Sequence, residues 1–79
     1  MPTVLRRGPY RFHFFASDRA EPRHVHASRD GADAKFWLDP VVDLAHNRGF
    51  TTRELREIQT IIENELQTLR DAWDDFFNP

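Results

Sequence analysis

Two histidines, His24 and His26, occupy alternate positions in a short run that follows Glu21 and Pro22. Alternate residues of a β-strand point to the same face, so these imidazoles would lie side by side, roughly 6.5–7 Å apart from the strand rise. Imidazoles titrate near neutral pH and bind divalent metals through a neutral nitrogen. The adjacent Arg23 carries a guanidinium, a group that binds phosphate in bidentate fashion. The pattern therefore predicts a site for a phosphate or a metal ion.

One hypothesis is catalysis on a phosphodiester of RNA. His24 and His26 would be the catalytic acid and base, and Arg23 would hold the phosphate, with Arg11 and Lys35 as further binding residues. Lys35, placed opposite His26, would favour the neutral imidazole that a general base requires. The alternative is that both histidines are ordinary polar residues of a solvent-facing strand. The residues leave open whether the chain is an enzyme.

A second hypothesis is a divalent metal site that uses His24 and His26. Two histidines need further ligands, and Lys35 nearby argues against a cation. The candidates for these ligands are other histidines and carboxylates of the chain: His13, Asp18, Glu21, Asp39 and His46. The sequence indicates no other cofactor, and neither of the other hypotheses requires one.

A third hypothesis is a protein–protein interaction module without catalysis. Trp37 is expected to be exposed beside the histidines, and tryptophan commonly anchors interfaces. His13 shares that face if the aromatic residues of its strand point into the core. The long C-terminal helix described below would project from a small domain, which favours a homodimer formed through it.

The elements that position these residues begin with a hairpin. Asp30-Gly31 is typical of a two-residue type I′ turn, which needs positive φ at both central positions. This turn predicts the pairing of His24 with Trp37, His26 with Lys35 and Val25 with Phe36, and directly opposed residues share a face. Val25, Ala27, Ala34 and Phe36 then face the core, while the histidines, Lys35 and Trp37 lie on the other face.

Further strands are expected at Thr3–Arg6, at Tyr10–Phe15 and, after Pro40, at Val41–Ala45, with Ala16–Pro22 as a polar loop. Thr51 and Glu54 form a capping box. A helix over 52–77 follows, with apolar residues three or four apart. That helix would be about 39 Å long, so it bends near Asn64 or projects. The predicted core comprises Tyr10, Phe12, Phe14, Val25, Phe36, Leu55, Ile58, Ile62, Leu66 and Leu69.

Length and composition bound the class of protein. The 79 residues make a single domain, 1–79. The absence of cysteine excludes disulfides and thiolate metal sites. No apolar run reaches the ~20 residues needed to span a bilayer, and the N-terminus lacks the apolar region of a signal peptide. A cytoplasmic location is therefore expected, without a membrane partner. Residues 1–29 carry six arginines against two acidic residues, a basic half suited to anionic ligands such as RNA.

At several separate points the chain resembles a bacterial family catalogued as domain of unknown function 4160. The stretches that carry the resemblance, in order, are Met1-Pro2-Thr3, Tyr10–Phe15, Asp18–His26, Ala34–Leu38, Arg48-Gly49-Phe50, Arg53–Arg56 and Ala72-Trp73. Where this chain has Arg23, the family often has a proline. The resemblance implies a small α+β fold. It also implies a gene beside a short protein of the domain of unknown function 2442 type, in an arrangement like a toxin–antitoxin pair, and no established reaction.

Together these inferences predict an α+β domain whose mostly antiparallel sheet of four to five strands is packed on one face by the C-terminal helix. The predicted function is that of a small cytoplasmic component of a toxin–antitoxin-like gene pair. It would act through the His24/His26 face on RNA or on a small cognate partner protein. The interaction module and the divalent-metal protein stay open as alternatives.

Overall fold

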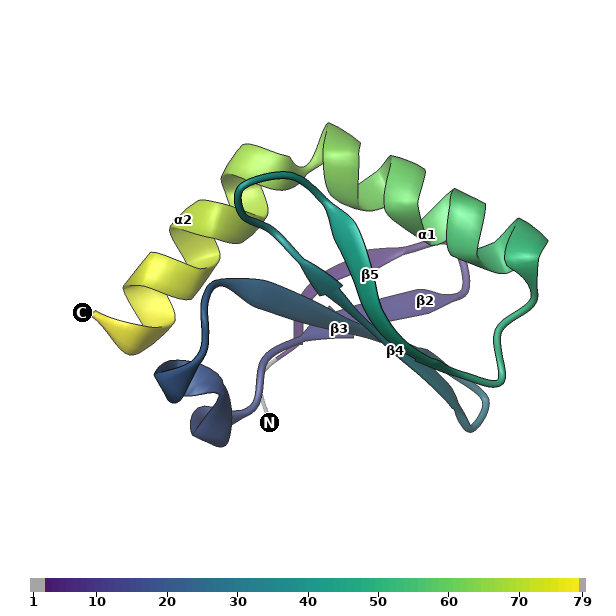
Figure 1. Cartoon of the computed structure of the whole chain (residues 1–79), viewed down its shortest axis with the longest axis horizontal. Helices are drawn as coiled ribbons and strands as arrows, with labels where there is room; N and C mark the ends of the chain where they lie inside the picture. Colours follow the sequence, from purple (N-terminus) through teal and green to yellow (C-terminus); the bar gives the residue numbers. More distant parts are fainter. Residues whose placement is uncertain (1–2, 79) are drawn as a thin grey trace.

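A computed structural model describes residues 3–78 as an antiparallel sheet followed by two helices. The two helices lie end to end across one side of the sheet (Figure 1). This architecture confirms the α+β class and a five-stranded antiparallel sheet. The strands, whose spatial order is their chain order, are β1 (Thr3–Arg7), β2 (Tyr10–His13), β3 (His24–Arg29), β4 (Ala32–Trp37) and β5 (Asp43–Arg48). The helices are the 3-10 helix η1 (Ala16–Ala20), α1 (Thr52–Asn64) and α2 (Leu66–Phe77).

The turn at Asp30-Gly31 sets the register of the central hairpin. Both residues have positive φ, 47° and 85°, as a type I′ turn requires. His24 pairs with Trp37 and Val25 pairs with Phe36, so the register predicted from the turn is confirmed. Neighbouring strands continue the same alternation, because Phe12 lies opposite Ala27 and His13 lies opposite His26.

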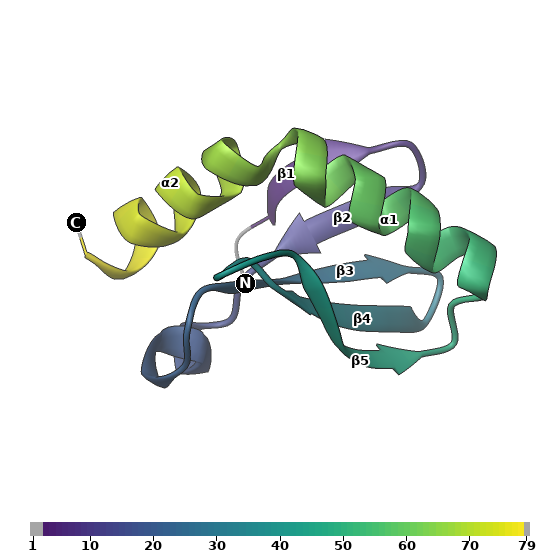
Figure 2. The same ribbon diagram turned by 45° about the horizontal axis from the view of Figure 1, so that its top comes forward.

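The alternation gives the sheet two chemically different sides. The helix side carries the apolar residues of the strands, which form one core with α1 and α2. The far side carries polar and basic residues, and η1 lies beside one end of the sheet, away from α1 (Figure 2). Eight of the ten predicted core residues are buried, while Leu55 and Leu66 are only partly buried. Ala27 and Ala34, which the hairpin register predicts to face the core, are also buried, and the buried apolar residues that the prediction lacks are Leu38, Phe50, Trp73 and Phe77.

The C-terminal helix is not continuous. The capping box at its start is confirmed, because Thr51 Oγ1 accepts from the Glu54 N–H at 3.1 Å and Glu54 Oε1 accepts from the Thr51 N–H at 3.0 Å. The helix is interrupted at Glu65, whose N–H is shared between two carbonyls of α1. A straight helix of about 39 Å would exceed the longest dimension of the domain, 34 Å. The break lets α2 follow the core, so a single long helix is wrong and a bend near Asn64 is right.

Element boundaries differ from the sequence prediction at four points. The first strand ends at Arg7 rather than Arg6. The second strand ends at His13 rather than Phe15, and the predicted loop over 16–22 contains η1. The last strand covers Asp43–Arg48, later than the predicted 41–45. Of these shifts, the one in the loop has consequences for the site, because η1 carries Asp18.

Candidate functional site

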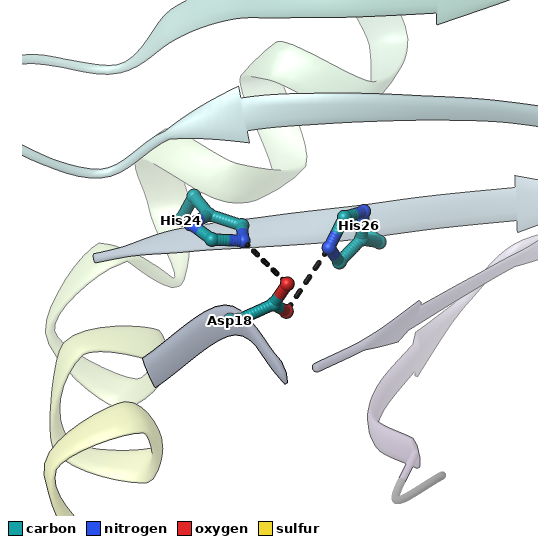
Figure 3. Close-up of side chains that lie close together, drawn as sticks. All are labelled: Asp18, His24 and His26. Carbon is teal, nitrogen blue, oxygen red and sulfur yellow. Dashed lines mark hydrogen bonds and ion pairs between the residues drawn. The ribbon is translucent and has the colours of Figure 1, made fainter. Parts of the chain in front are cut away.

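Asp18, His24 and His26 form a compact cluster at one end of the sheet (Figure 3). One ligand atom from each residue lies within 4.8 Å of the other two. Asp18 Oδ1 is 3.1 Å from His24 Nε2, and Asp18 Oδ2 is 3.0 Å from His26 Nε2. The carboxylate therefore bridges the two imidazoles that β3 presents side by side. We call these three residues the Asp-His-His cluster.

Local hydrogen bonds in η1 place the carboxylate. The Phe15 N–H donates to Asp18 Oδ2 at 2.8 Å, and the Glu21 N–H donates to the Asp18 carbonyl at 3.0 Å. Aspartate readily makes such bonds to a backbone N–H near the start of a short helix. The chain then turns through Pro22 into β3, which brings η1 over the histidines. Asp18 is thus held from both sides, by the Phe15 N–H before its own helix and by His26 Nε2 at 3.0 Å.

The hydrogen bonds of His24 define its tautomer. Its Nδ1 lies 2.9 Å from the Pro22 carbonyl oxygen and 3.6 Å from Glu21 Oε1, and both oxygens can only accept. Nδ1 must therefore carry a proton, which leaves the lone pair of the neutral ring on Nε2. That Nε2 is buried and has no partner with hydrogen-bonding geometry in residues 3–78. In the neutral form of the ring, this buried lone pair faces Asp18 Oδ1 at 3.1 Å.

Electrostatics favour the metal-binding forms of the other two residues. Burial lowers the pKa of His26 below its ordinary value, and this effect outweighs the attraction of Asp18. Burial would raise the pKa of Asp18, but the Phe15 N–H and the two histidines hold that pKa below its ordinary range. A neutral imidazole and an ionised carboxylate are the forms that bind metal ions.

Aromatic rings enclose the cluster. His13 stacks on His26 with ring centroids 5.6 Å apart, and Phe15 packs edge-on against His26 at 4.6 Å. Trp73 of α2 lies 5.0 Å from His24, and Trp37 lies 5.5 Å from it. His13 is itself buried, and burial lowers its pKa to about 4. It lies on the same face as the histidine pair, as expected, but that face is not open to solvent here.

The burial of His24 corrects the expected exposure of this face. His24 is completely buried, while the side chain of His26 is 18% exposed and that of Asp18 is 10% exposed. The alternative that both histidines are ordinary solvent-facing residues is therefore wrong. The reason is that η1 covers this end of the far side and Trp73 reaches His24 from α2, two contacts that no local sequence pattern predicts.

Lys35 and Trp37 lie next to the cluster on β4. The Lys35 ammonium pairs with Glu21 and lies 4.5 Å from the centroid of the Trp37 ring. Its charge is therefore neutralised locally, which weakens the argument that Lys35 repels a cation from this place. Trp37 is partly buried rather than fully exposed.

Two of the predicted site residues have other partners. Arg23 binds Asp39 at 2.7 Å and Asp74 at 3.1 Å, which ties the start of β3 to α2. Arg11 lies on β2 opposite Ser28 and donates to Thr3 Oγ1. Neither guanidinium has a hydrogen bond or ion pair with the Asp-His-His cluster among the described contacts.

Sequence reasoning included Asp18 in a set of five candidate ligands without distinguishing it from the others. Its position three residues after Phe15 is compatible with a bond to that N–H, and this is the signal that could have singled it out. The sequence carries no corresponding signal for the Pro22 carbonyl or for Trp73 at His24, because both contacts depend on how the chain turns in space.

Comparison with known families finds a match over most of the chain. The family model described as a domain of unknown function (DUF4160) matches residues 10–74. The chain belongs to that family. The match contains the whole Asp-His-His cluster. The chain has no match among curated proteins or among solved structures. No helix within residues 3–78 is both long and apolar enough to cross a membrane.

Proposed function

We propose that this DUF4160 protein binds a divalent metal ion through Asp18, His24 and His26. The observation that carries the proposal is the buried Nε2 of His24, which lies 3.1 Å from Asp18 Oδ1 without hydrogen-bonding geometry and carries a lone pair in the neutral ring. Two such electron-rich atoms repel each other in a low-dielectric interior unless a positive charge lies between them. That charge is either a proton or a metal ion, and the third ligand, His26, favours the ion.

The donor set fits zinc or a similar borderline ion. Zinc binds imidazole nitrogen at about 2.0–2.1 Å and carboxylate oxygen at about 2.0–2.2 Å in tetrahedral sites, where neighbouring ligand atoms are about 3.3 Å apart. Asp18 Oδ1 lies 3.1 Å from His24 Nε2 and Asp18 Oδ2 lies 3.0 Å from His26 Nε2, so each imidazole nitrogen is close to that distance from a different oxygen of the carboxylate. The Pro22 carbonyl orients the His24 ring in the way that outer hydrogen bonds orient metal-binding histidines. His26 would move its proton to Nδ1.

The burial of the ligand side chains favours a structural role for such an ion. His24 is completely buried, and the most exposed ligand side chain is that of His26, at 18%. A phosphodiester of a large RNA could not reach both imidazoles in this arrangement. The ion would instead fasten η1 to β3 and fix the loop between β2 and β3, a role in which metal binding adds directly to folding stability.

Zinc-dependent thermal unfolding tests this proposal. The chelator-treated protein is melted with increasing zinc, alongside His26→Gln and a control, His46→Gln, which removes an exposed imidazole from β5. We expect zinc to raise the melting temperature of the wild type and of His46→Gln but not of His26→Gln. Equal shifts for all three proteins, or none for the wild type, would refute the site. Calorimetric titration should give one zinc per chain.

The exposure of β5 favours a second candidate function. All six of its residues are exposed, and β5 is an edge strand that pairs only with β4. Leu44 and the nearby Val41 are exposed hydrophobic residues, and exposed edges accept a strand from a partner. The proposed partner is a small cognate protein of the domain of unknown function 2442 type, in a cytoplasmic toxin–antitoxin-like pair.

Co-expression tests this partnership. The two proteins should co-purify, and Leu44→Lys should weaken the complex, whereas Thr60→Lys on the exposed surface of α1 should not. Growth after induced expression of the chain alone, with and without the partner, would show which member is toxic. A complex unaffected by Leu44→Lys would refute docking along β5.

A further inference from the structure

A single row of side chains crosses all five strands on the far side of the sheet, two residues along from His26. Arg6 pairs with Arg11, Arg11 pairs with Ser28, and the row continues through Asp33 to Arg48. Directly paired residues share a face, so these five side chains point to the same side. With strands about 4.8 Å apart, the row is about 19 Å long. We call it the arginine row.

The positive charge of this row is concentrated at β1 and β2. Arg48 is neutralised by Asp33, whose carboxylate lies 2.6 Å away. Arg6 and Arg11 have no ion pair with a carboxylate within residues 3–78, and the partner of Arg11 is the neutral hydroxyl of Thr3 at 3.2 Å. Two like charges in directly opposed positions of a sheet destabilise it. An anion between them would remove that cost.

The same residues line a shallow pocket. Its volume is about 680 Å³, and its lining includes the whole arginine row together with Arg29 and Asp30 of the hairpin. Arg29 is bound by Glu54, so it adds little free charge. Four arginines against two aspartates nevertheless leave the lining net positive. The pocket is large enough for a nucleotide-sized group.

We propose that the arginine row binds the phosphate backbone of a single-stranded nucleic acid, with Arg6 and Arg11 holding one phosphate between them. Guanidinium groups bind phosphate in bidentate geometry, and Ser28 offers a hydroxyl beside them. The free positive charge spans only β1 and β2, but the pocket around it, of about 680 Å³, extends well beyond one phosphate group, which favours a strand over a single anion.

The next row on the same side favours a nucleic acid over an acidic peptide. His46 of β5 is exposed there, opposite Lys35 of β4. The partly exposed Trp37 lies two residues after Lys35 on β4. Proteins that bind single strands combine a cationic groove with rings on which bases stack. This proposal concerns a surface outside the Asp-His-His cluster and does not depend on a bound metal.

Fluorescence anisotropy with a labelled oligouridylate of about twelve nucleotides tests the row. Titrations are run with chelator present, at salt concentrations between about 50 and 200 mM. The variant is Arg6→Gln/Arg11→Gln, and the charge-matched control is Arg53→Gln/Arg56→Gln, which removes two exposed arginines from α1. Circular dichroism checks that both variants are folded.

We expect wild-type binding to weaken with salt and the Arg6/Arg11 variant to bind about tenfold or more weakly at low salt. Its slope of log affinity against log salt should fall by about 0.7, because Arg6 and Arg11 hold one phosphate and each neutralised phosphate of a single strand contributes about 0.7. The control should keep the wild-type slope. Absence of wild-type binding at about 50 mM salt, or equal losses in both variants, would overturn the proposal.

Competition with uridine monophosphate separates a strand from a single phosphate. At equal phosphate concentration, the mononucleotide should displace the labelled strand far less effectively than an unlabelled oligonucleotide does. Equal displacement would show that one phosphate group is the whole ligand, and would refute binding of a strand.

Discussion

Asp18→Asn should have opposite effects in the absence and in the presence of zinc. In the metal-free protein, the Asp18 carboxylate faces the unpartnered Nε2 of His24 at 3.1 Å. An amide can keep its oxygen on the Phe15 N–H and, after a small rotation, donate an N–H to that Nε2. A buried polar atom without a partner costs about 1–3 kcal/mol. The metal-free variant should therefore be no less stable than the wild type, and up to that amount more stable.

With zinc bound, the wild type should instead be more stable than Asp18→Asn. Amide oxygen is a far poorer zinc ligand than carboxylate, so the variant loses one of three proposed ligands. A ligand present at a hundred times its dissociation constant stabilises the native state by about 2.7 kcal/mol. For a domain of this size, each kcal/mol shifts the melting temperature by about 4–8 °C. The wild type should therefore gain about 10–20 °C under that condition, and Asp18→Asn only a small fraction of this.

The assay is thermal unfolding followed by circular dichroism, with chelator and then with zinc. Asp43→Asn is the control, since it removes an exposed carboxylate on β5, and it should follow the wild type in both conditions. Two results would refute the reasoning. Marked destabilisation of metal-free Asp18→Asn would show that an ion pair, not a repulsive contact, holds the cluster, and equal zinc shifts would show that Asp18 is not a ligand.

Three further predictions concern the scaffold. Tyr10, the single tyrosine, is buried and donates to Glu57 at 2.7 Å, and burial together with that carboxylate raises its pKa to about 12. The absorbance of its phenol should therefore titrate near that pH, and at a lower pH in Glu57→Gln. Because the folded protein binds this proton more tightly than the unfolded chain does, the free energy of unfolding should fall as pH rises from 10 to 12. Gly49→Ala should cost about 1–3 kcal/mol in urea unfolding, because Gly49 has φ of 98° and a β-carbon there would meet the Ala32 β-carbon at 3.1 Å. Thr51→Ala should cost about 1 kcal/mol in the same assay by removing the helix cap.

The hairpin was predictable because its determinants are local. Positive φ at Asp30 and Gly31 requires particular residues, and once the turn is placed, the pairing of every residue in β3 and β4 follows from counting. Counting residue pairs outward from the turn also placed His24 and His26 on one face with Lys35 and Trp37. The capping box at Thr51 is equally local, which explains why the start of α1 was also predicted correctly.

The burial of the Asp-His-His cluster was not predictable, because it depends on contacts between distant segments. The sequence alone does not indicate that Trp73 lies against His24 or that η1 covers the histidines, and both contacts convert an expected open surface into a buried cluster. Arg23 illustrates the same limit. Its neighbours in sequence suggested a phosphate clamp, but its partners in space are Asp39 and Asp74, which makes it a link between β3 and α2.

The two proposed sites share the far side of the sheet, and their separation limits how strongly they can influence each other. His26 and Ser28 are two residues apart on β3, so the arginine row lies roughly 7–10 Å from the cluster. At about 10 Å in water, a divalent charge attracts a phosphate by less than about 1 kcal/mol before screening, and the Debye length in physiological salt is about 8 Å. Zinc should therefore tighten oligonucleotide binding by less than about fourfold, with an effect that disappears at high salt. A larger, salt-resistant enhancement in anisotropy titrations would mean that the ion touches a phosphate directly, and the cluster would then have to open at η1 when nucleic acid binds.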